Sequence, residues 1–126
     1  MTSRRRRKLT QAELRALDAS PGLIEIEELS EKHFQAQVLR LAKLSGWLTY
    51  HTFDSRRSAP GFPDLVLVRP PAVLFAELKS ESGTLRPEQE AWLRKLARCE
   101  GVGARVWRPS DWPGIERTLR QRGGQG

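Results

Sequence analysis

Two short apolar runs joined by a proline-rich connection constrain the fold of this 126-residue chain more than any other feature. The first run, residues 65–68, is Leu-Val-Leu-Val and follows a loop rich in glycine and proline. The second, residues 73–79, begins apolar and ends with charges at alternate positions. Runs of this length between turn residues predict β-strands, and the short connection Arg69-Pro70-Pro71-Ala72 predicts a hairpin. We therefore expect two adjacent strands, the first of them buried on both faces.

Charged side chains stand at one end of this predicted hairpin. Asp64 begins the first strand, and Glu77 and Lys79 lie near the end of the second. Side chains two residues apart share a face of a strand, so Glu77 and Lys79 point the same way while Leu78 points into the core. In a hairpin the two carboxylates can then converge.

This set of groups suits the hydrolysis of phosphodiesters with a divalent metal. A hard cation such as Mg²⁺ prefers oxygen ligands, so the carboxylates of Asp64 and Glu77, with the carbonyl of Leu78, make a suitable shell for Mg²⁺ or Mn²⁺. A bound metal lowers the pKa of a water and neutralises charge that builds on the phosphate. Lys79 can orient the attacking water and stabilise the anionic transition state. The pattern predicts a metal-dependent phosphodiesterase.

Further motifs accompany this signature in a fixed order. They are Ser30-Glu31-Lys32-His33-Phe34-Gln35, Gly61-Phe62-Pro63-Asp64, Phe75-Ala76-Glu77-Leu78-Lys79, Gly83-x-Leu85, Pro87-Glu88-Gln89-Glu90-Ala91-Trp92-Leu93 and a strand from Val102 to Trp107. In that order they resemble the VRR-NUC domain, a branch of the PD-(D/E)XK nuclease superfamily with the restriction-endonuclease-like fold, found as small phage and bacterial proteins. The resemblance covers about residues 30 to 118. It implies a metal-dependent DNA endonuclease. The resemblance allows a structure-selective enzyme that cleaves four-way (Holliday) junctions or flaps, and it equally allows cleavage of ordinary duplex.

Carried over position by position, the resemblance implies the roles of five side chains. It makes Asp64 and Glu77 metal ligands, Lys79 the catalytic lysine, Glu31 a helix acid that faces the metal site, and Gln89 a site residue at the start of a later helix. One departure is visible at position 86. The family often has a serine N-cap just before the proline of that helix, and this chain has Arg86.

Helical periodicity supports Glu31 and Gln89 independently. With Ser30 as N-cap, Glu31 lies three residues before Phe34 on the apolar side of a helix, and Gln35 follows as a weaker candidate. Gln89 begins a stripe that continues through Trp92, Leu93 and Leu96 at helical spacing, so it is expected to face inward. Trp92 is interpreted as a core residue.

The whole pattern predicts an α/β fold. We expect a helix, three strands in a meander, a helix, a fourth strand from Ala104 to Trp107 that crosses over to pair, and a final helix from about Pro109 to Gln121. These would form a central mixed sheet of about four strands flanked by helices. The domains expected are a basic tail and acidic linker at 1–29, the nuclease domain at 30–122 and a flexible C-terminus at 123–126.

The charge of the chain points to DNA as the partner. Its 22 Lys and Arg against 15 Asp and Glu give a net charge of +7, which attracts phosphate without regard to sequence. The pair Arg56 and Arg57 precedes Asp64, and the run Arg4, Arg5, Arg6, Arg7 and Lys8 forms a basic tail. We expect both to contact nucleic acid. The single cysteine, Cys99, and the absence of a long apolar run favour a cytoplasmic protein with no membrane partner and no small-molecule cofactor.

Other interpretations stay open at this point. Glu77 and Lys79 could be a strand-end ion pair, Asp64 a turn residue and Gln89 a solvated helix residue. The fold could also serve a catalytically inactive DNA-binding or assembly module. An RNA-binding protein is disfavoured, because the aromatic residues lie in apolar stripes and leave no stacking platform. Cleavage of a four-way junction would call for a homodimer that presents two active sites.

Overall fold

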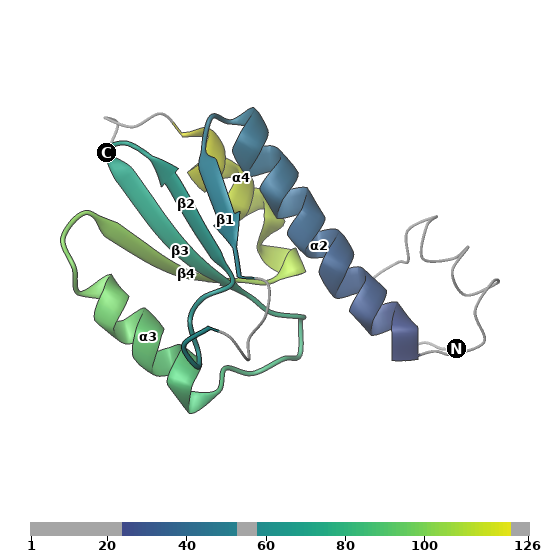
Figure 1. Cartoon of the computed structure of the whole chain (residues 1–126). Helices are drawn as coiled ribbons and strands as arrows, with labels where there is room; N and C mark the ends of the chain where they lie inside the picture. The colour runs from purple at the N-terminus through teal and green to yellow at the C-terminus, as the bar shows by residue number, and fades with distance from the viewer. Residues whose placement is uncertain (1–23, 53–57, 122–126) are drawn as a thin grey trace. The chain divides into compact units, whose positions relative to one another are not determined.

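The computed structural model describes residues 24–52 and 58–121, with side chains from residue 31 onward. It divides into two compact units, Met1–Phe34 and Gln35–Gly126, and the sheet lies in the second unit. The elements, shown in Figure 1, are α2 (Ile24–Leu44), β1 (Leu48–His51), β2 (Leu65–Arg69), β3 (Ala72–Leu78), α3 (Pro87–Ala97), β4 (Val102–Trp107), a 3₁₀ turn η1 (Pro109–Asp111) and α4 (Trp112–Arg120). The predicted basic tail and the flexible C-terminus lie outside the described residues.

The first helix corrects the sequence prediction at its N-terminus. The sequence predicts a start after Ser30, with an acidic linker before it, but α2 already runs from Ile24. Glu25, Glu27 and Glu28 are therefore helical, which suits glutamate as a good helix former. In the second unit, the later turns of α2 bury Val38, Leu41 and Ala42 on one stripe.

The four strands form one mixed sheet in the order β1-β2-β3-β4. β1, β2 and β3 are antiparallel neighbours, and β4 pairs with β3 in parallel after the crossover through α3. The turn Pro70-Pro71 joins β2 to β3 as predicted, with Arg69 opposite Ala72 and Leu65 opposite Ala76. The structure thus confirms the predicted α/β fold, a meander followed by a parallel fourth strand.

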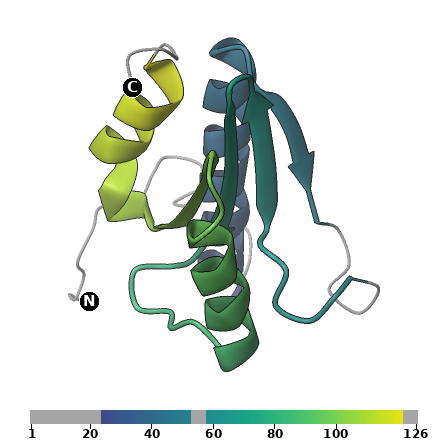
Figure 2. The ribbon, with the colours of Figure 1, turned by 90° about the vertical axis from the view of Figure 1, so that its left-hand side faces the viewer.

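The two faces of the sheet are covered by different helices. In Figures 1 and 2 the last turns of α2 and α4 lie on one side of the sheet, and α3 lies on the other. The side chains of Leu65, Leu67, Leu74 and Ala76 share the first face and are almost fully buried. α4 adds Ile115 and Leu119, both with no exposed surface.

The second face is covered only in part. α3 contacts β3 and β4. Val66 and Val68 of β2 are therefore only half-buried, and Leu48 and Tyr50 of the edge strand β1 are exposed. The prediction that β2 is buried on both faces is wrong for this reason: one helix of three turns is too narrow to cover four strands.

The C-terminal end of α4 is tied to the far end of the hairpin. The indole Nε1 of Trp47 donates a hydrogen bond to the carbonyl of Leu119 at 2.9 Å, and the Arg69 guanidinium donates to the same carbonyl at 3.0 Å. That guanidinium also lies 4.5 Å from the centre of the Trp47 ring. These bonds satisfy one of the last carbonyls of the helix and leave the opposite end of the sheet for the site.

Within residues 24–52 and 58–121, no helix is both long and apolar enough to cross a bilayer.

Candidate active site

The register of the hairpin brings the predicted acids together. Since Leu65 pairs with Ala76 in antiparallel fashion, the preceding Asp64 lies opposite the following Glu77. The backbone continues this arrangement, because the N–H of Leu78 donates to Oδ2 of Asp64 at 2.9 Å. Asp64 is therefore held against the end of β3 by a main-chain donor.

Glu77 is a buried carboxylate with one oxygen left without a partner. Its exposed fraction is 3 %. One oxygen, Oε2, accepts a hydrogen bond from Nε2 of Gln89 at 2.9 Å and lies 3.9 Å from Nζ of Lys79. The other, Oε1, has no hydrogen-bond partner among the described residues. An unpaired buried carboxylate oxygen is costly, so a cation bound at this atom would remove a penalty that the fold otherwise carries.

The electrostatics of the pair agree with this geometry. Burial, together with the nearby carboxylate of Asp64, raises the pKa of Glu77 from 4.5 to about 8, and Lys79 opposes the shift. Two acids so close that one resists ionisation are typical of sites where a divalent ion compensates the charge.

Gln89 links the first turn of α3 to Glu77. Its Oε1 accepts a hydrogen bond from the backbone N–H of Arg86 at 2.8 Å, and its Nε2 donates to Glu77. Because both ends of the amide have a partner, its orientation is fixed and the Glu77 carboxylate is held in turn. The predicted inward orientation of Gln89 is confirmed, since it is 7 % exposed.

A clamp formed by Gly61, Phe62 and Trp92 fixes the loop before Asp64 against α3. The Phe62 ring packs edge-on against Phe75 and Trp92, with centroids 6.1 and 5.1 Å away, and Trp92 Nε1 donates to the carbonyl of Pro60 at 3.1 Å. Gly61 has φ +83°, and a Cβ there would lie 2.5 Å from the backbone of Glu88. The sequence predicts Trp92 in the core, but it is only half-buried, and through these contacts the clamp sets the loop that carries Asp64.

A cleft of about 210 Å³ opens beside Asp64. Its walls come from the loop before β2 and the start of α3: Thr52, Ser58, Ala59, Gly61, Phe62, Asp64, Arg86 and Gln89. The cleft therefore brings one of the two paired acids to solvent, where a phosphodiester can approach.

The remaining predicted residues fall outside this group. Glu31 is exposed and belongs to the first unit. Its catalytic role stays a prediction. Gln35 is half-buried in the second unit. Arg56, Arg57 and the tail Arg4, Arg5, Arg6, Arg7 and Lys8 lie outside the described residues.

The sequence does not predict two features of the site. The sequence marks Arg86 only as a missing cap, yet this residue lines the cleft. The ring contacts of Phe62 have no local signature either, although its place between Gly61 and Pro63 signals a tightly packed loop.

The oxygen donors of the site fit a hard cation. In the part of the chain that the structure describes, no three His, Cys, Asp or Glu side chains lie close enough together to hold a metal ion on their own. The donors on hand are the two carboxylates and main-chain carbonyls, which suit an ion that keeps several waters.

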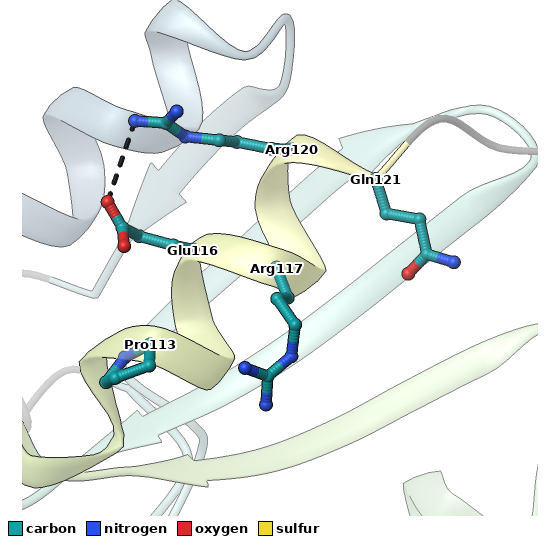
Figure 3. Close-up of a pocket in the computed structure, with 5 residues that line it drawn as sticks. All are labelled: Pro113, Glu116, Arg117, Arg120 and Gln121. Atoms are coloured by element: carbon teal, nitrogen blue, oxygen red, sulfur yellow. Dashed lines mark ion pairs between the residues drawn. The ribbon is translucent and has the colours of Figure 1, made fainter.

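A second hollow lies along the outer side of α4 and shares no residue with the cleft. Figure 3 shows its lining, Pro113, Glu116, Arg117, Arg120 and Gln121, with the Glu116–Arg120 ion pair at 3.6 Å. It contains no pair of carboxylates. We therefore assign the candidate site to the cleft beside Asp64.

The match to a known family agrees with the chemistry of the site. The sequence model of a family described as the VRR-NUC domain matches residues 10–109. Among solved structures, the chain is similar to a Holliday junction resolvase of Archaeoglobus fulgidus, an archaeal hyperthermophile, with 22% sequence identity and a TM-score of 0.47. That match covers 61% of this chain and 67% of the resolvase. A comparison with curated proteins gave no match.

Proposed function

Because this chain belongs to the VRR-NUC domain family, a family of nucleases, we propose that it is a metal-dependent DNA endonuclease whose active site is the Asp64 cleft. In this proposal we take residues 30–122 as the nuclease domain and Mg²⁺ or Mn²⁺ as the ion. The observation that carries the proposal is the buried Glu77 Oε1, which has no partner among the described residues and lies beside a second carboxylate.

Each side chain of the site has a separate task in this proposal. Asp64 and Glu77 hold the cation, with the carbonyl of Leu78 as a third oxygen donor. The ion would supply Lewis-acid stabilisation of phosphate and a more acidic bound water. Lys79, whose ammonium faces Glu77, holds the attacking water and stabilises charge on the phosphate.

Gln89 acts through Glu77 and not on the substrate. It fixes the carboxylate by one hydrogen bond and is itself fixed by the start of α3. Glu31 is a further candidate acid, carried by the family resemblance alone. The basic residues Arg56 and Arg57 and the run from Arg4 to Lys8 contribute phosphate attraction, which the net charge of +7 supports.

A cleavage assay across DNA structures tests the proposal. Duplex, flap and four-way-junction DNA are incubated with Mg²⁺, Mn²⁺ or EDTA, using the wild-type protein, Asp64→Ala and the surface control Glu100→Ala. We expect cleavage by the wild type and the control with either metal, and none in EDTA or by Asp64→Ala. Cleavage by Asp64→Ala at the wild-type rate would refute the site assignment.

The same assay separates the substrate classes and the alternative function. Paired, symmetric cuts in a four-way junction, together with a dimer in sedimentation, would assign junction resolution. A monomer that makes single cuts would assign flap or duplex cleavage. DNA binding without cleavage of any substrate in either metal would favour the inactive DNA-binding module.

A further inference from the structure

Arg86 occupies a position where its side chain makes no structural contact that the described residues account for. It is the N-cap of α3, where a side-chain oxygen normally accepts a hydrogen bond from the first turn. A guanidinium has only donors, so it cannot serve as that acceptor. Only the backbone of Arg86 takes part, its N–H bonding Gln89 and its carbonyl accepting from Glu90.

Among the described residues, the guanidinium also has no ionic partner. Throughout the described part of the chain it forms no ion pair or side-chain hydrogen bond, and the residue is exposed. By contrast Arg94 in the same helix pairs with Glu90 at 3.0 Å, and Arg108 binds the carbonyls of Ser80 and Gly83, each at 2.6 Å. Arg86 is thus an uncommitted cation.

Arg86 is one of the residues that line the candidate cleft. Asp64 lines the same cleft. The backbone N–H of Arg86 donates a hydrogen bond to the side-chain amide of Gln89. The cleft's other charged group, Asp64, repels phosphate until a cation is bound. An arginine fork matches two phosphate oxygens, so it suits a diester held at this opening.

We propose that the Arg86 guanidinium binds a backbone phosphate of the DNA next to the scissile phosphodiester and positions the strand over Asp64 and Glu77. The inference rests on the proposed nuclease function. It assigns a phosphate subsite to the residue that opens α3.

Arg86→Ser separates this role from a structural one. Serine at the N-cap supplies the missing acceptor, so the thermal midpoint should stay unchanged or rise. Removal of a pair of charge-assisted hydrogen bonds should lower kcat/KM about 10-fold to 100-fold, while the Mn²⁺ concentration for half-maximal rate stays constant. Arg98→Ala, an exposed charge at the far end of α3, serves as the matched control and should cleave like the wild type.

The phosphate that Arg86 contacts is identified with DNA substrates in which one phosphate is replaced by an uncharged linkage. Substrates carry one methylphosphonate at each position near the mapped cut in turn. We expect the methylphosphonate at one position to slow cleavage by the wild type strongly. The same substitution should not slow Arg86→Ser or Arg86→Gln beyond their rates on unmodified DNA. Wild-type activity in Arg86→Ser, or equal sensitivity of wild type and variant at every position, would overturn the inference. Either result leaves the nuclease assignment intact as long as Asp64→Ala is inactive.

Discussion

Glu77 is the residue on which the site depends most, because it is buried, close to a second acid and, among the described residues, without a hydrogen-bond partner at one oxygen. These properties are unfavourable in a metal-free protein and favourable once a cation is bound. Its neighbours divide the remaining tasks: Gln89 holds the carboxylate in place, and Lys79 remains able to meet water and phosphate. This division predicts how variants of Glu77 and Lys79 should behave.

Glu77 should make stability depend on pH. Its pKa is raised from 4.5 to about 8 on folding, so the protonated form is favoured in the folded state. The contribution of Glu77 to the free energy of unfolding is complete below about pH 4.5. It is lost as the pH rises towards about 8, at up to about 1.4 kcal/mol per pH unit. Urea unfolding in EDTA should show this slope for the wild type and for the exposed control Glu100→Gln. Glu77→Gln should lack this part of the pH dependence. An identical slope in all three proteins would contradict the assignment of the pH dependence to Glu77.

Lys79 should affect the rate of cleavage and not the affinity for the metal, because it acts on water and phosphate and is not a ligand. Lys79→Ala should lower the maximal rate of single-turnover cleavage by about 10²-fold or more, as for other charge-stabilising groups. The Mn²⁺ concentration that gives half the maximal rate should not change. A large rise in that concentration would mean that Lys79 supports metal binding, and the division of roles would be wrong.

Among the elements, the β2–β3 hairpin is the most predictable from sequence. Its apolar runs and proline turn determine the register, and the register alone places Asp64 opposite Glu77. The start of α2 is not predictable in the same way, because a serine inside a helix has the same local signature as a cap. The partial cover of β2 also escapes prediction, since which strands α3 spans depends on the crossover and not on local pattern.

The cleft is predictable only in part for a related reason. The sequence indicates Gln89 by its inward stripe, but the pairing of its two amide ends requires the three-dimensional position of Arg86 relative to Glu77. The close approach of Gly61 to Glu88 joins two distant segments of the chain, and no local pattern encodes it.

Gly61 provides the test at the scale of elements. Gly61→Ala must place a Cβ 2.5 Å from the main chain of Glu88 at a φ of +83°, so the loop has to move away from α3. We expect the free energy of unfolding to fall by about 1–3 kcal/mol and cleavage to be reduced. Gly101→Ala is a matched control, since its φ is +78° with no atom within 4 Å of the added Cβ. Equal destabilisation in the two variants would show that the packing of the loop on α3 is unimportant.

At the scale of the whole molecule, the net charge of +7 should govern DNA affinity more than any single side chain. The basic tail lies outside the described residues, and its role is a prediction from sequence. Removal of residues 1–8 should weaken DNA binding and reduce the slope of log affinity against log salt by about 4 to 5, at roughly 0.9 for each phosphate that the tail neutralises. The metal requirement should not change. A slope equal to that of the full chain would show that the tail does not bind DNA.

Asp64 and Glu77 are proposed to form the metal centre of the nuclease together, so neither carboxylate should bind the ion without the other. Calorimetric titration with Mn²⁺ tests this most directly, using the wild type, Asp64→Ala, Glu77→Ala and the exposed control Glu100→Ala. We predict saturable binding by the wild type and the control, and no such binding by either site variant, although both remain folded. Undiminished binding by Asp64→Ala or by Glu77→Ala would contradict the assignment of the metal centre.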